Sequence, residues 1–390
     1  MKYIKIAIGL LILLFSYLIP RNKKKWVFGS NMGYSNNAKY FFWYVVEILK
    51  KNDCIWIGSD RDVNIVRKLG YKAYRPWSAK GLYHSLTASA YIYDSYIGDI
   101  NLYTFGGAKR VCLWHGVGIK YIEKKITSGP IHDIFNSQNI FVKVANLSLF
   151  IKPNLFLSTS PLMTKHFADC FDIPEKLCFE GVYPRCEIFK WDKELLMKYI
   201  CKYEPSESLS LIRKMDSFKY TYLYMPTWRD NGRDFIKDSN IDLALLDEVL
   251  KKTNQFFILK FHPATKINID FKDYSNIFLL DNKLDIYPIL PFTNCLITDY
   301  SSVFYDYILL DGKKCILFIP DYKEYIEVDR GFAFDYITNT TGYKVTLFEE
   351  LLHVIEDNTL LEGCMLNVDR IISRFWGTES KEINDFFRAI

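Results

Sequence analysis

The sequence lacks the cysteine pattern of a disulfide-stabilised or zinc-binding protein. Its nine cysteines are an odd number, and no two of them form a Cys-x-x-Cys pair. Secreted disulfide frameworks use an even set of cysteines, and structural zinc sites use closely spaced ones. Cys295 and Cys315 lie inside apolar runs, where cysteine acts as a small hydrophobic residue. The composition therefore indicates a protein of a reducing compartment.

A large net charge and low-complexity tracts are also absent. The net charge of +5 is small for 390 residues. It argues against a nucleic-acid-binding protein, although it suits an anionic membrane surface or a phosphorylated substrate. Apolar residues make up 49% of the chain and charged residues 24%, which indicates a globular protein. The length is sufficient for two domains of ordinary size.

An apolar segment near the N-terminus is too short for an ordinary membrane span. Residues 6–19 read I-A-I-G-L-L-I-L-L-F-S-Y-L-I, and no small-x-small cleavage site follows. As a helix this segment would be about 21 Å long, against a hydrocarbon layer of roughly 30 Å. Basic residues flank it on both sides: Lys2 and Lys5, then Arg21, Lys23, Lys24 and Lys25. We therefore predict a hydrophobic membrane-anchor helix over residues 1–22, either monotopic or a short span, with the body at the cytoplasmic face of the cell membrane.

Short apolar runs alternate with helical patterns along the rest of the chain. Continuous apolar strands that alternate with helices predict parallel sheets covered on both faces. A charged, helix-prone stretch at 190–218 divides the runs into two series. We therefore predict an α/β fold with two Rossmann-like domains, at residues 23–195 and 196–390. The expected strands are 25–29, 54–58, 91–94, 110–114, 155–159 and 177–180, then 220–225, 256–261, 277–280, 294–298 and 315–319.

Polar clusters follow four of these expected strands. In open parallel sheets, ligands bind beyond the carboxyl ends of the strands. One histidine at such a position is more often structural, but four clusters together indicate a site. The clusters are W-H-G at 114–116, P-T-W-R-D at 226–230, K-F-H-P at 260–263 and T-D-Y-S-S at 298–302.

The fourth cluster has the features of a phosphate receptor. A helix that begins near Ser302 exposes free N–H groups with a partial positive charge. Ser301 and Ser302 add hydroxyl donors, so phosphate oxygens could bind there. The alternative is that Asp299 or one of the serines only caps the helix, which is worth about 1 kcal/mol. Capping and anion binding can coexist.

Five segments together resemble the CDP-glycerol glycerophosphotransferases of teichoic acid and capsule synthesis. The resemblance covers most of the chain after the apolar segment. It implies a GT-B-type architecture, in which two Rossmann-like domains face each other across a cleft and the second binds most of the donor. It also implies transfer of glycerol phosphate from CDP-glycerol to a lipid-linked glycan acceptor, with release of CMP. The segments are L-W-H-G-V-G-I-K (113–120), Y-M-P-T-W-R-D (224–230), K-F-H-P (260–263), I-T-D-Y-S-S-V-F-Y-D-Y (297–307) and D-R-G-F (329–332).

The same resemblance implies roles for single residues. His115 is the expected general base, and His262 is the expected second catalytic histidine, on the leaving phosphate. The expected substrate-binding residues are Thr227, Arg229, Asp299, Ser301, Ser302 and Arg330. The chain departs from the family in the first domain, where Val117-Gly118 replaces Thr-Pro and Cys186 replaces the Asn or Asp after Arg185. The acceptor is therefore less defined than the donor.

Three alternatives stay open at the level of the sequence. The donor could be CDP-ribitol or another CDP-polyol, the enzyme could be a nucleotide-sugar glycosyltransferase, or the chain could be a catalytically silent membrane scaffold. No cofactor and no metal site are predicted. Asp60-Arg61-Asp62 has the D-x-D form of some metal-dependent transferases, but its turn-like surroundings favour a solvated loop.

Overall fold

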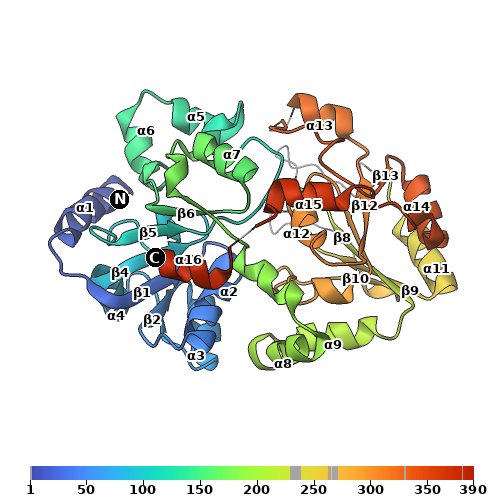
Figure 1. Ribbon diagram of the computed structural model, residues 1–390, viewed down its shortest axis with the longest axis horizontal. Coiled ribbons are helices and arrows are strands. Elements are labelled where there is room, and N and C mark those ends of the chain that lie inside the picture. Colours follow the sequence, from blue (N-terminus) through green and yellow to red (C-terminus); the bar gives the residue numbers. More distant parts are fainter. Residues whose placement is uncertain (1, 229–238, 262–264, 266–270, 329–330, 380) are drawn as a thin grey trace. The chain divides into compact units, whose positions relative to one another are not determined.

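The computed structural model describes residues 2–228, 239–261, 265, 271–328, 331–379 and 381–390. The chain forms two compact units, each with its own parallel sheet and associated helices (Figure 1). Unit 1 comprises Met1–His115, Ile122–Glu187 and Phe375–Ile390, and unit 2 comprises Gly116–Tyr121 and Ile188–Arg374. The predicted α/β class with two parallel sheets is confirmed.

Unit 1 contains a seven-stranded sheet in the order β3-β2-β1-β4-β5-β6-β7, and all its neighbouring strands are parallel. This order reverses direction beside β1, as in doubly wound folds, and ligands bind at such a point. The strands are β1 (Asn22–Gly29), β2 (Cys54–Ile57), β3 (Ala73–Tyr74), β4 (Ala88–Tyr93), β5 (Lys109–Cys112), β6 (Leu155–Ser158) and β7 (Cys178–Glu180).

Unit 2 contains a six-stranded parallel sheet in the order β10-β9-β8-β11-β12-β13. Its order also reverses at its first strand, β8, so the same rule places a ligand beyond β8 and β11. The strands are β8 (Tyr220–Met225), β9 (Gln255–Leu259), β10 (Ile277–Leu279), β11 (Cys295–Thr298), β12 (Lys314–Phe318) and β13 (Tyr343–Val345).

Helices connect the strands in both units. The helices of unit 1 are α1 (Lys2–Ser16), α2 (Asn36–Trp43), α3 (Asp60–Lys68), α4 (Ala79–Thr87), α5 (Gly129–Asn136), α6 (Ile140–Ala145), α7 (Pro161–Phe171) and α16 (Ile383–Ala389). Those of unit 2 are α8 (Lys193–Tyr203), α9 (Ser206–Met215), α11 (Leu243–Thr253), α12 (Val303–Tyr307), α13 (Tyr322–Val328) and α14 (Phe348–Glu356). Helix α15 (Val368–Trp376) begins in unit 2 and ends in unit 1.

Strands that read as continuous apolar runs are buried on both faces. Every residue of β2, β9 and β11 is buried, as expected for parallel strands covered on two sides. Cys295 and Cys315 are fully buried, in agreement with their reading as small hydrophobic residues. All nine cysteines are free thiols.

The predicted domain limits differ from the two units in several places, and one of them is Gly116–Tyr121, which belongs to unit 2. The predicted boundary at 195/196 lies inside unit 2, which already begins at Ile188. The last segment, Phe375–Ile390, belongs to unit 1 although the sequence placed it in the second domain. Phe386 of this segment packs against Phe41 and Phe179, with ring centroids 5.4 and 5.2 Å apart. Such long-range packing leaves no local signal in the sequence.

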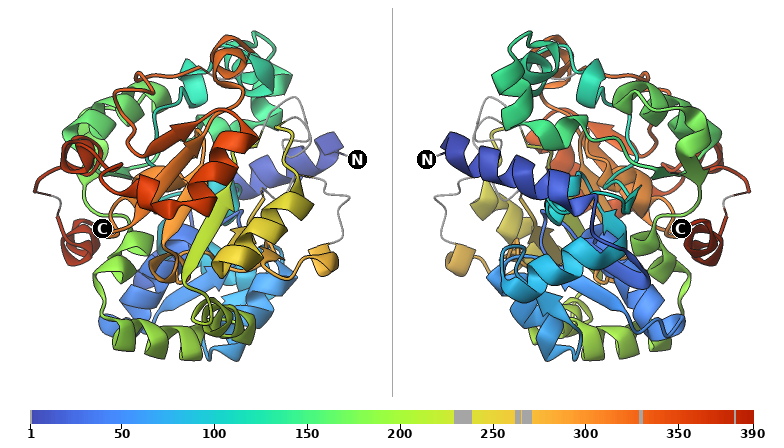
Figure 2. Two further views of the ribbon diagram at one scale, coloured as in Figure 1. Left: turned by 90° about the vertical axis from the view of Figure 1, so that its right-hand side faces the viewer. Right: turned by 90° about the vertical axis from the view of Figure 1, so that its left-hand side faces the viewer.

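The N-terminal apolar segment forms helix α1, which packs against the rest of unit 1 along one side. Gly9 contacts the Tyr103 ring so closely that a Cβ would lie 2.5 Å from it. At the C-terminal end of α1, the Ser16 hydroxyl accepts a hydrogen bond of 2.9 Å from Gly106 N. Figure 2 shows α1 on the outside of the molecule with the N-terminus at its free end. None of the helices in the described part of the chain has the length and apolar character to cross a bilayer, which contradicts the short-span form of the prediction.

The predicted anchor over residues 1–22 is also too long, because its end is part of unit 1. The Arg21 guanidinium donates hydrogen bonds to five backbone carbonyls, those of Ser16, Ser85, Ala88, Thr104 and Gly106. Strand β1 follows directly, and the buried Lys25 ammonium donates to the Thr87 hydroxyl at 2.7 Å. Of the four basic residues predicted to follow the apolar segment, Arg21, Lys23, Lys24 and Lys25, only Lys23 and Lys24 are exposed. The other two support the fold.

Candidate functional site

Three neighbouring strands of unit 1 end in polar residues. Strand β4 pairs with both β1 and β5. After their last residues come Ser30 (β1), Asp94 and Ser95 (β4), and His115, three residues beyond β5. Because parallel strands end at the same edge of a sheet, these side chains share the position where doubly wound folds bind ligands. The sequence predicted His115 there but gave no role to the other three.

The His115 ring is held by the end of β4. Its Nδ1 lies 3.2 Å from the Ser95 hydroxyl, and the imidazole also hydrogen-bonds the backbone of Asp94. The Trp114 ring lies beside it, with centroids 4.0 Å apart. When Nδ1 carries the proton, Nε2 keeps its lone pair and can accept another proton. The residue is partly exposed.

Its surroundings keep the His115 imidazole neutral. Burial, and next the positive charge of Arg185, lower the pKa of His115 to about 4. Both effects disfavour the charged form of the ring. The imidazole is therefore unprotonated near pH 7 and able to accept a proton.

The backbone at this histidine is strained. Trp114 is buried and has a φ of +53°, a left-handed conformation that a bulky side chain rarely adopts. Such residues persist where their surroundings fix them, and they gather at functional sites. The Trp114 carbonyl accepts a 2.8 Å hydrogen bond from Asn37 Nδ2, and the His115 carbonyl accepts one of 2.8 Å from Arg185. Sequence reasoning missed Asn37 and noted Arg185 only as part of a family motif.

Two buried aspartates support the same strand ends. Asp94 accepts a 2.8 Å hydrogen bond from Ala38 N in the first turn of α2, and burial raises the pKa of Asp94 well above its usual value. Asp99 accepts from Ser95 N at 2.8 Å, and burial raises the pKa of Asp99 to about 7. A polar pair directly after the apolar run 88–93 was the signal that could have located this support.

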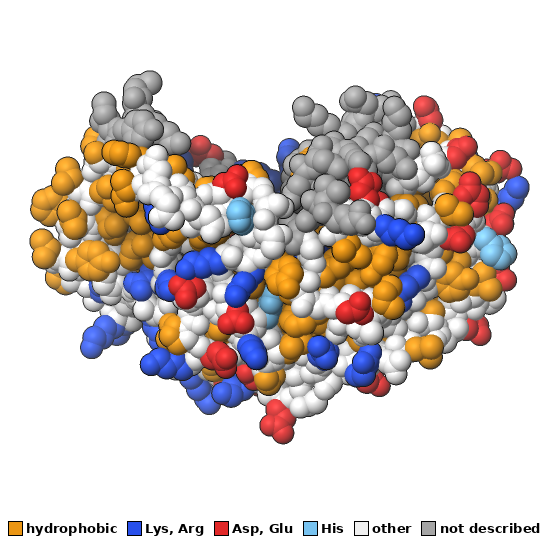
Figure 3. All heavy atoms as spheres, turned by 90° about the horizontal axis from the view of Figure 1, so that it is seen from above, with side chains coloured by type: hydrophobic (Ala, Val, Ile, Leu, Met, Phe, Trp, Pro, Cys, Tyr) orange, Lys and Arg blue, Asp and Glu red, His pale blue; other side chains and the backbone are white. Residues whose placement is uncertain are grey.

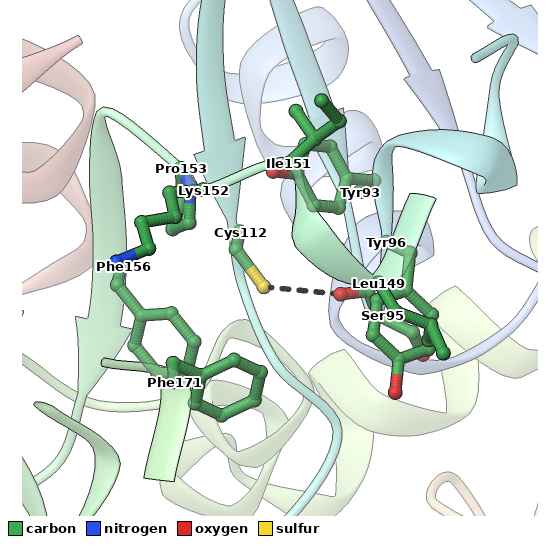
Figure 4. Close-up of a pocket in the computed structure, with 10 residues that line it drawn as sticks. All are labelled: Tyr93, Ser95, Tyr96, Cys112, Leu149, Ile151, Lys152, Pro153, Phe156 and Phe171. Carbon is green, nitrogen blue, oxygen red and sulfur yellow. Dashed lines mark hydrogen bonds between the residues drawn. The ribbon is translucent and has the colours of Figure 1, made fainter. Parts of the chain in front are cut away.

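A small pocket lies beside Ser95 (Figure 4). Its lining is mostly apolar and includes Tyr93, Phe156 and Phe171, with the Cys112 thiol donating to the Ser95 carbonyl at 3.6 Å. Lys152 lies at the pocket, but its ammonium donates to the Asp172 carboxylate at 2.7 Å. The lining suits an apolar group better than a diphosphate.

In unit 2, Asp299 joins the ends of the neighbouring strands β8 and β11. Its carboxylate accepts from Thr227 N at 2.9 and 3.1 Å and from Tyr300 N at 2.6 Å. Asp299 is buried, so it fixes the two loops. The alternative that Asp299 caps the next helix is wrong.

The helix after β11 begins near Ser302, as predicted, and is short. Helix α12 spans only Val303–Tyr307, and Ser302 at its start makes no capping hydrogen bond through its side chain. Ser301 Oγ accepts a long hydrogen bond of 3.4 Å from Val303 N. Both serine side chains are partly exposed. A five-residue helix gives little dipole, so the predicted phosphate site depends on the two hydroxyls and not on the helix.

The segment directly after His115 belongs to unit 2. A Cβ on Gly116 would lie 2.8 Å from Ser302 Oγ and 3.1 Å from Ser302 Cβ, so a larger residue here would displace the Ser302 side chain. Further along, the Ile119 carbonyl accepts from Ala333 N at 2.6 Å, and Lys120 forms an antiparallel bridge with Phe332. Residues 116–121 therefore lie against the Ser302 loop and the segment after the D-R-G-F glycine.

Three predicted site residues, Arg229, His262 and Arg330, lie outside the described residues. Within the described residues, no group of three or more metal-ligating side chains is found. The D-x-D segment is the start of α3, and Asp62 forms a capping box with Ser59. It is therefore a helix start and not the predicted loop.

Comparison with known proteins agrees with this picture. The model of the CDP-glycerol:poly(glycerophosphate) glycerophosphotransferase family matches residues 11–373. A teichoic acid poly(glycerol phosphate) polymerase of Bacillus spizizenii is 26% identical over 91% of this chain and 89% of its own. A teichoic acid ribitol-phosphate primase of the same species is 24% identical over 74% of this chain and 72% of its own.

A similar fold is present among solved structures. The wall teichoic acid polymerase TagF superposes with a TM-score of 0.73 at 23% identity, over 92% of this chain and 86% of that one. At this identity the likeness concerns the fold alone. The family model spans both units, and the chain is a member of the CDP-glycerol:poly(glycerophosphate) glycerophosphotransferase family of transferases.

Proposed function

We propose that this enzyme transfers glycerol phosphate from CDP-glycerol to a hydroxyl of a lipid-linked glycan or a growing polyol-phosphate chain in teichoic acid or capsule synthesis. The observation that carries the proposal is the neutral, positioned imidazole of His115 at the strand ends of unit 1, in a chain of this family. A neutral imidazole suits the deprotonation of an alcohol, and such a base typically contributes about 10²–10⁴-fold.

The proposed reaction is a displacement at phosphorus. The acceptor oxygen forms a bond to the β-phosphorus of the donor, and the bond from that phosphorus to the bridging oxygen breaks. CMP leaves, and the hydroxyl proton passes to Nε2 of His115. Phosphoryl transfer otherwise needs positioning and donors toward the phosphate oxygens. We assign that role to Ser301 and Ser302, with Thr227 and Asp299 shaping the loop, and to Arg229, His262 and Arg330.

The proposal is tested by the products. The full chain is incubated with CDP-glycerol, CDP-ribitol and UDP-glucose, each with a lipid-linked disaccharide. Release of CMP from CDP-glycerol, with one glycerol phosphate added to the acceptor by mass spectrometry, supports the proposal. Preference for CDP-ribitol would support the second candidate, which the similarity to a ribitol-phosphate primase favours. Release of UDP would indicate a glycosyltransferase, and no turnover of any donor would indicate a scaffold.

The serine hydroxyls give a separate prediction for the donor. We expect the double substitution Ser301→Ala/Ser302→Ala to weaken CDP-glycerol binding about 100-fold, because a lost hydrogen bond to a charged group costs about 1.5–3 kcal/mol. Isothermal titration calorimetry measures the affinity. Ser210→Ala/Ser217→Ala, at exposed positions of the same unit, is the control. Equal affinity in the two double variants would remove the donor role from the pair.

We also propose that α1 lies in the membrane interface, at the cytoplasmic face. Four apolar residues of α1, Ile8, Leu11, Leu14 and Phe15, are 53–67% exposed, and Leu18 in the turn after the helix is 78% exposed. Ile140 and Phe141 of α6 in the same unit are 63% and 68% exposed. In Figure 3, hydrophobic side chains gather on the side where Figure 1 places α1 and α6. An apolar helix face with basic residues nearby is typical of interfacial binding, which suits an enzyme whose acceptor is attached to a lipid.

A further inference from the structure

Arg185 is a charged residue in an unusual position, buried inside unit 1. It lies in the 3-10 helix η6 (Pro184–Lys190) and is 2% exposed. Arginine is almost never buried to this extent unless its donors are used. Here the guanidinium donates to the His115 carbonyl at 2.8 Å and to Asn36 Oδ1. Its cation also lies over the Tyr183 ring, 5.2 Å from the centroid.

Two asparagines complete this arrangement. Asn37 Nδ2 donates to the Trp114 carbonyl at 2.8 Å, and Asn37 Oδ1 accepts from the Arg185 backbone N at 3.3 Å. Asn36 Oδ1 accepts from Asn37 N at 3.0 Å and from the guanidinium. Both asparagines are buried. We call Asn36, Asn37 and Arg185 the loop clamp, because together they hold the two consecutive carbonyls of Trp114 and His115.

We infer that Arg185 is a positioning residue for the His115 base and is not a ligand of the donor phosphates. This inference rests on the proposed function. The loop needs such a clamp, because a left-handed Trp114 is disfavoured on its own and would relax if its carbonyl were free. Relaxation would move the imidazole away from Ser95, and a displacement of about 1 Å in a catalytic geometry can cost about 10²-fold in rate.

The charge of Arg185 allows its role to be tested by a second measurement, the pH dependence of the activity. Its positive charge disfavours the imidazolium, so it contributes to the lowered pKa of His115. Other ionisable groups on the elements packed here include Tyr93, Asp94, Tyr96, Asp99 and Cys112. Burial raises the pKa of each, and that of Asp99 is raised to about 7. Asp99 bonds the Ser95 backbone and is common to all variants below, so it cannot account for a difference between them.

The test compares Arg185→Gln, Arg185→Lys and Asn37→Ala in the full chain. CMP release from CDP-glycerol is measured from pH 4 to 8, with a lipid-linked disaccharide that carries one glycerol phosphate as acceptor. We expect Arg185→Gln to lower kcat about 100-fold and to move the acid limb of the profile to higher pH. Arg185→Lys keeps the charge and should keep the acid limb. Asn37→Ala should lower kcat without moving the limb. All three should bind CDP-glycerol as the wild type does.

Each outcome decides for or against the inference. A weaker CDP-glycerol affinity in Arg185→Gln with kcat unchanged would make Arg185 a donor ligand. If Arg185→Gln is soluble and folded and the acid limb of its pH profile does not move, Arg185 supports the structure only and does not influence the pKa of His115. If Arg185→Gln does not fold, an unchanged kcat in Asn37→Ala overturns the clamp. The proposed function fails separately, when the wild-type chain releases no CMP from CDP-glycerol.

Discussion

Replacing His115 by alanine is expected to lower kcat by about 10²–10⁴-fold and to leave the affinity for CDP-glycerol unchanged. The expected factor is that of a positioned general base in proton transfer. Donor affinity should persist because the ring bonds only Ser95 and the Asp94 backbone among the described residues. CMP release under saturating donor measures the first quantity, and calorimetry with CDP-glycerol measures the second.

The matched control is His132→Ala, because His132 lies on α5 of the same unit and bonds Asp133. It should leave both quantities unchanged. Loss of CDP-glycerol affinity in His115→Ala would make the histidine a donor ligand instead.

The lowered pKa of His115 also predicts how the activity of the wild type depends on pH. The imidazole loses its acceptor lone pair when it is protonated, so kcat/KM should fall as the pH drops toward about 4, and not near 6.5. An acid limb near 6.5 would contradict the lowered pKa described for His115.

The second large effect concerns the membrane. We expect Leu14→Glu/Leu18→Glu to lower the partitioning of the full chain onto phosphatidylglycerol-containing vesicles by about 10³-fold. Burial of a leucine side chain is worth about 1.5–3 kcal/mol, so two such losses remove roughly 4 kcal/mol, and tenfold corresponds to about 1.4 kcal/mol. Both leucines are exposed, at 67% and 78%, so the fold should tolerate the change. Vesicle co-sedimentation measures the partitioning.

The control for this experiment is Leu347→Glu/Leu366→Glu in unit 2, where the leucines are 57% and 70% exposed. These changes add the same charge and remove the same side chains at a distance in sequence from α1. If the two double variants lose binding equally, charge and not the α1 face is responsible. If neither loses binding, another surface attaches the protein. Substitution is a sharper test than deletion of residues 1–22, because deletion would also remove Arg21 and its five carbonyl contacts.

The sequence predicted the sheets and the position of His115 because both depend on local patterns. Apolar runs of strand length become parallel strands, and the residues just beyond them reach the ligand-binding edge. The left-handed Trp114 could not be predicted, since its conformation is imposed by Asn37 and Arg185 from distant parts of the chain.

Unit 1 is not formed from one continuous stretch of the sequence. Its last segment, Phe375–Ile390, follows the whole of unit 2. Thr159 Oγ1 donates to the Phe375 carbonyl at 2.6 Å, and the Phe387 ring packs 5.1 Å from that of Trp26 in β1. During synthesis, unit 2 is therefore available to fold before its partner is finished. The apolar surface of unit 1 that packs against α16 stays exposed to solvent until residues 383–389 have been synthesised and have left the ribosome. A nonsense codon near position 375 would thus damage the half that carries His115 and spare the sheet that carries the serines.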